Sequence, residues 1–347
     1  MRSRKAWLFI MKIGIAKSGS MEELYGEKYN TSFFEALWKE NLIDKLEPED
    51  EVVWIDRAEL ANLDKAAADF DAIIGLWIVD DMINETLLTN HPKLKYASTL
   101  SHGFGRIDAE ACHRHGVTVT NTVYGDVTIA QFAIALLLDI CHNIGANDHY
   151  YKHEKWLPEN AGKRMLARTP QIELYEKTFG IIGLGNIGFC AAQMAAGFGM
   201  KVISYSRHKK EGEKYDFIEQ VSLDELLARS DVISIHCPLT EESRNVINAE
   251  TIAKMKDGVI LINTARGAII DEPALVEALN NGKVYAAGLD VVAGEPLKEP
   301  CELMNCKNTV MTEHIAWAPV ESRIRSIKIG CENFLNWKEG HPTSVVV

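Results

Sequence analysis

A glycine-rich stretch in the middle of the chain restricts the possible folds more than any other feature. In "GIIGLGNIGFCAAQMAAGFGMKV", Gly183, Gly185 and Gly188 form the pattern G-x-G-x-x-G between a strand-like and an alanine-rich helical segment. The first glycine permits a tight turn, the second lets a pyrophosphate approach the backbone, and the third lets helix and strand pack closely. The helix N-terminus then offers free N–H groups to the anion. With the strand-like "KVISYS" following, the pattern favours a dinucleotide-binding fold over an ordinary structural turn.

Strand-like and helical segments alternate along the whole chain. Short apolar runs separated by longer amphipathic stretches are typical of β-α-β units around a parallel sheet. The strand candidates are "KIGIA", "EVVWI", "DAIIGLWI", "KLKYAST" and "VTVTN" in the first part, and "FGIIGLG", "KVISYS", "DVISIH", "VILINTA", "YAAGLDVV" and "TVMTEHIA" in the second. A last helical segment, "ESRIRSIKIGCENFLNWKEG", follows them, and we expect it to return to the first part of the chain.

The chain is long and apolar enough for two packed cores, with 347 residues of which 47% are hydrophobic. We expect an α/β protein of two doubly wound parallel-sheet domains, in which a Rossmann cofactor domain is inserted into a flavodoxin-like substrate domain. The substrate-binding domain would comprise residues 1–122 and 315–347. The dinucleotide-binding domain would comprise residues 123–314.

Composition and charge exclude several classes of partner. A formal net charge of -12 argues against nucleic acid. The seven cysteines are scattered, without C-x-x-C or zinc-type spacing, so we expect reduced thiols, a cytoplasmic location and no metal. No apolar stretch is long enough for a membrane span. The start "MRSRKAWLFI" does not fit a secretory signal, and residues 1–10 are interpreted as an upstream-start extension.

Three further motifs follow the glycine turn in a characteristic order. They are "INTARGAIIDEPAL" (262–275), "AAGLDVVAGEP" (286–296) and "MTEHIAW" (311–317), with "HGFGRIDAEACHRHGVTVTNT" (102–122) in the first domain. In these motifs, their order and their approximate spacing, the chain resembles the D-isomer-specific 2-hydroxyacid dehydrogenases almost end to end. The resemblance implies a nicotinamide-dependent oxidoreductase that interconverts a 2-oxo acid and a D-2-hydroxy acid, in the manner of glyoxylate or hydroxypyruvate reductases.

The resemblance assigns catalytic roles to three residues. Arg266 would clamp the substrate carboxylate and polarise its keto oxygen, because a guanidinium is a planar, permanently charged fork. His314 would exchange a proton with that oxygen, and Glu295 would hold the other ring nitrogen and favour the imidazolium form. Taken singly, Arg266 could be a surface ion-pair partner, Glu295 a turn cap and His314 a satisfied core histidine. Their joint order behind a dinucleotide turn favours catalysis.

The same resemblance implies contacts to substrate and cofactor. Backbone amides around Ser101, His102 and Gly103 would complete the carboxylate seat, where His102 either assists binding or orders the loop. Trp77 in the first domain and Trp317 after the histidine would either shrink the pocket toward glyoxylate or hydroxypyruvate, or offer an apolar wall to a larger acid. Further cofactor contacts are expected at Asn186, Ile187, Pro238, Thr264, Ala265 and Asp290, the last at the nicotinamide carboxamide.

The segment "SYSRHKK" bears on the choice of cofactor. In an NAD-specific Rossmann domain, an acidic residue about 20 positions after the glycine motif accepts hydrogen bonds from the ribose 2′-hydroxyl. Ser206 stands there, followed by Arg207, His208, Lys209 and Lys210. Arginine pairs with phosphate and stacks on adenine. The segment therefore predicts NADP(H) in preference to NAD(H), with a solvated basic turn as the alternative.

Some features depart from the family pattern. Glu313 stands where proline usually precedes the catalytic histidine, and Gln131-Phe132 stand where Glu-His is frequent. His149 and His153 lack the intervening glutamate of zincin chemistry, so a solvated helix is the better interpretation.

The sequence also bears on two alternative functions and on the oligomeric state. A nucleotide-sensing corepressor of the same fold would need long biased segments that this chain lacks. Formate oxidation fits less well because that branch pairs its histidine with glutamine. We expect a homodimer through the cofactor domain, from the apolar helix at 128–140 and the aromatic "HYYKHEKW" that follows it.

Overall fold

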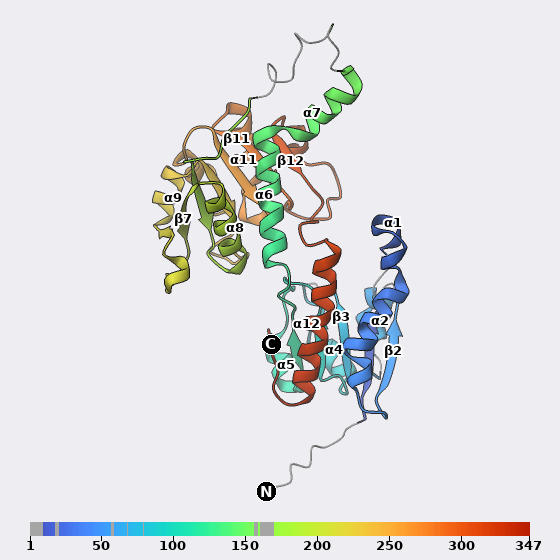
Figure 1. The fold of residues 1–347 in the computed structure, drawn as a ribbon. Coiled ribbons are helices and arrows are strands. Elements are labelled where there is room, and N and C mark those ends of the chain that lie inside the picture. The colour runs from blue at the N-terminus through green and yellow to red at the C-terminus, as the bar shows by residue number, and fades with distance from the viewer. Residues whose placement is uncertain are drawn as a thin grey trace. The chain divides into compact units, whose positions relative to one another are not determined.

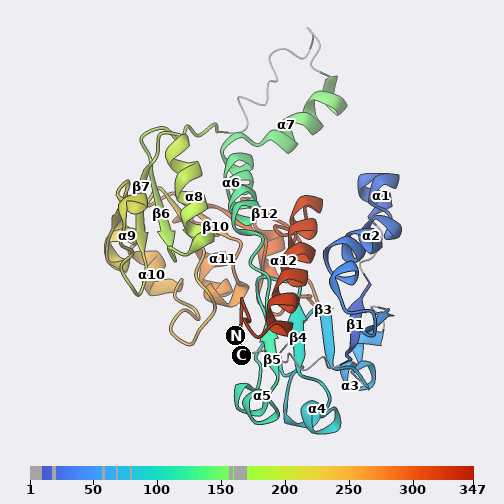
Figure 2. The same cartoon turned by 60° about the horizontal axis from the view of Figure 1, so that its bottom comes forward.

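The computed structural model of the chain describes residues 10–17, 21–56, 59–67, 69–78, 80–155, 159 and 170–347. Residues 1–9 of the expected N-terminal extension and Trp156 of the aromatic segment lie outside the described residues. The chain divides into two compact units, one formed by Met1–Gly125 with Ala318–Val347 and the other by Asp126–Trp317. Each unit contains a sheet with helices packed on both of its faces (Figure 1, Figure 2).

The first unit is built on a five-stranded parallel sheet with the strand order β2-β1-β3-β4-β5. This order is that of flavodoxin-like folds. The strands are β1 (Lys12–Ala16), β2 (Glu51–Ile55), β3 (Ala72–Leu76), β4 (Tyr96–Thr99) and β5 (Thr118–Thr120). The helices are α1 (Glu22–Tyr25), α2 (Thr31–Asn41), α3 (Leu63–Ala66), α4 (Glu85–Asn90), α5 (Ala109–His115) and α12 (Val320–Lys338).

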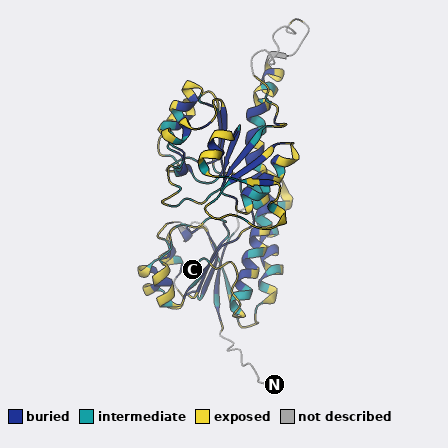
Figure 3. Ribbon diagram, turned by 90° about the vertical axis from the view of Figure 1, so that its left-hand side faces the viewer, coloured by how far each residue is buried: buried dark blue, intermediate teal, exposed yellow. Residues whose placement is uncertain are grey.

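Two hydrophobic cores fill the two faces of this sheet. Because successive strand residues point to opposite faces, neighbours such as Ile73 and Ile74 serve different cores. Ile74 packs with Trp38 of α2 and Phe334 of α12, while Ile73 packs with residues of α3, α4 and α5. The C-terminal helix α12 is therefore part of the first unit, to which the helical segment was expected to return. Figure 3 shows the strands of both sheets as largely buried.

The last residues of the chain cover the edge of this sheet. The N–H of Val119 in β5 donates to the carbonyl of Val347, and the N–H of Val346 donates back to the carbonyl of Val119, each at 2.9 Å. Thr120 forms an antiparallel bridge with Val345. An uncovered edge strand offers unpaired backbone groups to other chains, so this short tail protects β5.

The second unit contains a seven-stranded parallel sheet with the order β12-β11-β10-β9-β6-β7-β8. This is the Rossmann order with one additional strand at one edge. The strands are β6 (Thr178–Ile182), β7 (Lys201–Tyr205), β8 (Ile218–Gln220), β9 (Val232–Ile235), β10 (Val259–Asn263), β11 (Val284–Leu289) and β12 (Thr309–Met311). The α-helices are α6 (Asp126–His142), α7 (Ile144–Tyr150), α8 (Asn186–Gly197), α9 (Leu223–Arg229), α10 (Ala249–Ala253) and α11 (Glu272–Asn281).

The central strands β6, β9 and β10 of the second unit are buried on both faces, as strands covered by helices on either side must be. Ile181 of β6 packs in a core with α6 and α8, and Ile182 packs in the opposite core with α9, α10 and α11. Gly288 lets α6 lie close to the sheet, because a Cβ there would stand 2.9 Å from Leu136 Cβ.

The predicted fold class is confirmed, since both units are doubly wound parallel sheets and the Rossmann unit is inserted into the other. One strand was missed. β8 has only three residues, with Glu219 at its centre, so its sequence shows no apolar run. The assignment of 1–122 and 315–347 to substrate binding and of 123–314 to the cofactor stays a prediction.

The helices in the described part of the chain differ in length and apolar composition from membrane spans. No single helix there has both the length and the apolar composition of a span. The helix α6 and the following segment Ile144–His153, bent by 51° at the break between them, satisfy these criteria only when they are taken together.

All seven cysteines carry free thiols.

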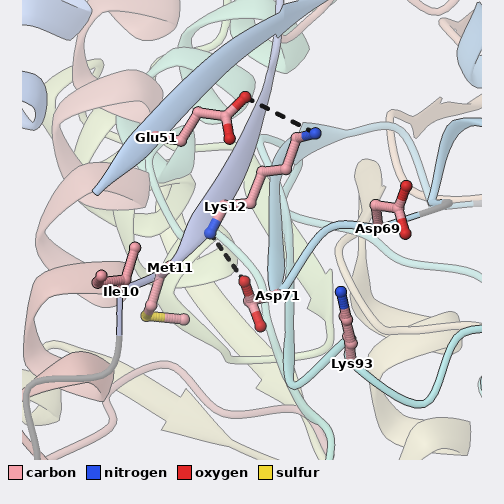
Figure 4. Close-up of a pocket in the computed structure, with 7 residues that line it drawn as sticks. All are labelled: Ile10, Met11, Lys12, Glu51, Asp69, Asp71 and Lys93. Carbon is pink, nitrogen blue, oxygen red and sulfur yellow. Dashed lines mark hydrogen bonds and ion pairs between the residues drawn. The ribbon is translucent and has the colours of Figure 1, made fainter. Parts of the chain in front are cut away.

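Figure 4 shows a pocket on the first unit that is lined by charged residues. Lys12, Glu51, Asp71 and Lys93 line it, at or just before the amino ends of β1 to β4. The N–H of Lys12 donates to Asp71, and its ammonium lies 3.7 Å from Glu51. Ligands of open parallel sheets bind at the carboxyl ends of the strands, so this pocket lies at the edge opposite to the one expected for a substrate.

Candidate active site

The carboxyl edge of the seven-stranded sheet collects the residues predicted for catalysis and cofactor binding. Carboxyl ends of parallel strands meet at one edge, and the crevice where the strand order reverses is the usual ligand site. In this unit the order reverses between β6 and β9. The predicted residues that follow these strands are Gly183 after β6, Ser206 after β7, Pro238 after β9, Thr264 and Arg266 after β10, Asp290 after β11 and His314 after β12.

Each glycine of the motif has its own steric reason. Gly183 has a φ of 100°, and a Cβ on it would lie 2.5 Å from the backbone nitrogen of Cys237. A Cβ on Gly188 would lie 2.3 Å from the carbonyl oxygen of Gly183. A Cβ on Gly185 would meet no described atom within 4 Å. Two glycines therefore serve packing of the turn, and the third leaves open space for a ligand to approach the backbone.

The residues at this turn fit a bound dinucleotide. Gly185 is the N-cap of α8, and no side chain of the described residues caps it, so the amides of Asn186 and Ile187 are available to an anion. The Nδ1 of His236 and the Oγ1 of Thr264 are buried and lack a hydrogen-bond partner among the described residues. They follow the paired strands β9 and β10 by one residue. Buried polar atoms without partners are costly unless a ligand or water satisfies them.

The segment after β7 is held at both ends. The hydroxyl oxygen of Ser206 accepts the N–H of Leu184 at 2.7 Å, so this side chain braces the glycine turn. The backbone of Lys210 exchanges two hydrogen bonds with the side chain of Gln220. Between these anchors Arg207, His208 and Lys209 are exposed. The structure thus presents three basic side chains on a loop with fixed ends.

His314 and Glu295 form the pair that the sequence predicted. Nδ1 of His314 lies 2.9 Å from Oε2 of Glu295, and both side chains are about one-third exposed. Glu295 comes from the loop after β11 and His314 from the turn after β12. Because Nδ1 is engaged, Nε2 is left without a partner in the described part of the chain. A carboxylate on one ring nitrogen fixes the orientation of the ring and leaves the other nitrogen for proton transfer.

Asp290 holds the turn that carries His314. Its buried carboxylate accepts the hydroxyl of Thr312 at 2.6 Å and the N–H groups of Ile315 and Ala316 at 2.8 and 2.9 Å. Its carbonyl accepts the N–H of His314 at 2.8 Å. The structure therefore gives Asp290 a bracing role that sequence reasoning missed, while its contact with the nicotinamide carboxamide stays a prediction.

A second buried polar residue shapes the turn that carries Arg266. Asn263, at the end of β10, accepts the N–H of Ala265 through Oδ1 and donates through Nδ2 to the carbonyl of Arg266, each at 3.0 Å. The guanidinium of Arg266 donates to the carbonyl of Ala265 at 2.6 Å. Sequence reasoning did not single out Asn263, although an asparagine at a strand end is a common source of such local turns.

The loop with Glu295 packs directly against the turn with Arg266. A Cβ on Gly267 would lie 2.0 Å from the backbone carbon of Val292, so only glycine permits this approach. The N–H of Ala293 donates to Glu272 at 2.6 Å, which ties the loop to the start of α11. Gly267 and Glu272 both lie in the segment 262–275 that the sequence analysis singled out, but roles were assigned there only to Thr264, Ala265 and Arg266.

The residues predicted for substrate binding lie at the carboxyl edge of the sheet in the first unit. Trp77 directly follows β3 and is 47% exposed. The hydroxyl of Ser101, after β4, donates to the carbonyl of Gly103 at 2.5 Å. The carbonyl of His102 accepts from the amide of Asn121 at 2.7 Å. The structure thus describes an ordered loop at 101–103, and its contact with a substrate stays a prediction.

The burial of His236 predicts how the stability of the protein depends on pH. Burial lowers the pKa of His236 from 6.5 to about 4, so the folded protein keeps this ring neutral while the unfolded chain protonates below pH 6.5. The free energy of unfolding should fall as the pH drops from 6.5 toward 4, by at most about 1.4 kcal/mol per pH unit. Urea denaturation at pH 7 and pH 5 measures it. We expect His236→Gln to show a smaller fall in the free energy of unfolding between pH 7 and pH 5. The exposed control His208→Gln should show the same fall as the wild type. Equal losses in the wild type and His236→Gln would contradict the prediction.

Comparison with known proteins gives matches along most of the chain. The model of the NAD-binding domain of the D-isomer specific 2-hydroxyacid dehydrogenases matches residues 134–316. A hydroxypyruvate reductase of Blautia hydrogenotrophica is 43% identical over 256 residues, which cover 74% of this chain and 79% of that protein. A glyoxylate reductase of Aeropyrum pernix is 39% identical over 277 residues, which cover 79% of this chain and 82% of the relative.

The fold agrees with this relationship. The crystal structure of the TT0316 protein of Thermus thermophilus superimposes with a TM-score of 0.76 and 31% sequence identity, covering 97% of this chain and all of the other. The resemblance found in the sequence motifs is therefore confirmed. The chain belongs to the D-isomer specific 2-hydroxyacid dehydrogenase family and is an NAD(P)-dependent oxidoreductase that acts on CH–OH donors.

Proposed function

We propose that the protein reduces a small 2-oxo acid, of the glyoxylate or hydroxypyruvate class, to the corresponding D-2-hydroxy acid. The observation that carries the proposal is the 2.9 Å contact between His314 and Glu295 at the same sheet edge as the dinucleotide turn. The relatives named hydroxypyruvate reductase and glyoxylate reductase support this substrate class. They give no support to the corepressor alternative.

The roles of the side chains follow from their chemistry. When bound, the nicotinamide supplies the hydride that adds to the carbonyl carbon of the substrate. His314 donates the proton from Nε2 to the carbonyl oxygen, and Glu295 stabilises the imidazolium from which that proton leaves. Arg266 binds the substrate carboxylate through its planar fork. In the reverse direction the neutral imidazole takes the proton back from the hydroxyl group.

We propose that the first unit contributes contacts to the substrate. Backbone amides of the loop with Ser101, His102 and Gly103 would bind the carboxylate, and Trp77 would limit the size of the side chain. The ordered 101–103 loop and the exposed ring of Trp77 support this proposal. A substrate panel ranked by kcat/KM reports the preferred acid.

Replacement of the proposed general acid tests the reaction. We expect His314→Ala to lower kcat for the reduction of glyoxylate and hydroxypyruvate by about a hundredfold or more, because general-acid assistance is typically worth that factor. Cofactor affinity, followed by fluorescence titration, should remain close to that of the wild type. The exposed His113→Ala in α5 serves as a matched control and should keep full activity. Equal turnover by His314→Ala and the wild type would remove the assignment.

We propose a preference for NADP(H), based on the loop after β7. Nη1 of Arg207 lies 3.8 Å from a carboxylate oxygen of Glu242, and both side chains are well exposed. A hydrogen bond from Thr240 and the charge of Arg207 hold the pKa of Glu242 below its usual value, so this carboxylate is ionised. Such an exposed pair is weak. A 2′-phosphate, which carries more charge and three acceptor oxygens, would take the guanidinium in its place.

The cofactor preference is tested by kcat/KM for NADPH and NADH. Charge-assisted contacts are each worth about 1.5 to 3 kcal/mol, so Arg207→Ala should cost at least about tenfold for NADPH and spare NADH. Ser206→Asp combined with Arg207→Ala should reverse the preference, since the carboxylate would bind the ribose and repel the phosphate. Lys201→Ala, the same type of charge loss at the other end of β7, is the control. A wild type that prefers NADH defeats the proposal.

We further propose a homodimer through the second unit. Val127, Ile144 and Tyr151, in or next to α6 and α7, are 55, 61 and 59% exposed. Exposed apolar side chains along one apolar helix and its continuation favour burial against a second copy. Light scattering at micromolar concentration should report about twice the chain mass of 38.8 kDa. A mass of one chain under these conditions would exclude the dimer.

A further inference from the structure

The backbone of His314 adopts a conformation that is rare for a residue with a side chain. Its φ is 56°, in the left-handed region that favours glycine. Such a conformation persists only where surrounding contacts determine it. The contacts that fix His314 therefore decide where its ring points.

The indole of Trp317 supplies one of these contacts. Its Nε1–H donates to the carbonyl oxygen of His314 at 2.7 Å. The N–H of His314 is bound by the carbonyl of Asp290, and its ring is bound by Glu295. The carbonyl of His314 is the other polar group of its backbone, and Trp317 binds it.

The peptide group between His314 and Ile315 is consequently held from both of its polar ends. Trp317 binds its carbonyl oxygen, and the carboxylate of Asp290 binds its N–H at 2.8 Å. A residue in the left-handed region can relax by rotation of the following peptide plane. That rotation would break both hydrogen bonds here. The peptide plane is therefore fixed as long as the indole of Trp317 and the carboxylate of Asp290 are both in place.

We propose that Trp317 is a positioning residue for His314, which locks this peptide plane and so aims Nε2 at the substrate oxygen. The proposal rests on the proposed function, in which Nε2 donates the proton. In this proposal the hydrogen bond from the indole N–H positions His314, and the bulk of the ring does not. Phenylalanine matches the apolar body of tryptophan approximately but carries no donor, so it separates the two contributions.

The test compares Trp317→Phe with the wild type. Loss of one hydrogen bond should lower kcat about three- to tenfold, while KM for the cofactor stays unchanged. Hydrogen exchange of a peptide covering residues 312–317 should become faster in the protein without substrate. Trp54→Phe in β2 is the control for the loss of a tryptophan elsewhere, and should change neither readout. If Trp317→Phe does not fold, Trp317→Leu, which also carries no side-chain donor, takes its place.

A double-mutant cycle distinguishes positioning from a general structural effect. If Trp317 acts through His314, Trp317→Phe should not reduce the residual kcat of His314→Ala any further. An equal fold-loss in both backgrounds, or unchanged exchange at 312–317, would overturn the proposal. The exchange experiment needs no turnover. Absence of activity on every 2-oxo acid would therefore defeat the proposed function, while faster exchange in Trp317→Phe would still establish the lock.

Discussion

The arrangement of the site depends on the hydrogen bonds that the buried carboxylate of Asp290 accepts. Its oxygens bind three donors of the turn after β12, and its own N–H donates to the carbonyl of Asn263 at 3.0 Å. Asn263 in turn shapes the segment with Arg266. A buried polar network of this kind is costly when it is incomplete and rigid when every group is paired. The turns that carry Arg266 and His314, the two residues proposed to act on the substrate, are thus braced by one connected set of hydrogen bonds.

The glycine-rich turn of the second unit depends instead on the close approach of backbone segments to one another. Gly183 and Gly188 allow the turn to pack, and Gly185 leaves room for the pyrophosphate. Ser206 adds a brace by binding the N–H of Leu184. In an NAD-specific domain a carboxylate occupies this position and contacts the ribose. Here a short side chain that serves the turn stands at this position, and three exposed basic residues follow it.

Much of the fold could be predicted from the sequence, because strands buried on both faces read as short apolar runs between helical segments. "FGII", "KVIS" and "VILIN" correspond to observed strands, whereas β8, with Glu219 at its centre, gives no such signal. In the site, the pairing of His314 with Glu295 was predicted by resemblance and is present. The bracing residues Asp290, Asn263 and Gly267 were not recognised as such, because their partners lie 2 to 26 positions away and the folded backbone decides which groups meet.

The sequence by itself determined the two α/β units and the glycine-rich turn, because these depend on local periodicity and on residue types at fixed spacing, and its family resemblance pointed to the candidate catalytic side chains. Only the tertiary structure decided how those side chains are held. The left-handed backbone of His314, the indole that binds its carbonyl and the lowered pKa of His236 all result from contacts between strand ends. The physical reason is that hydrogen-bond partners and burial depend on which strands are neighbours in the sheet, and a linear pattern does not contain that order.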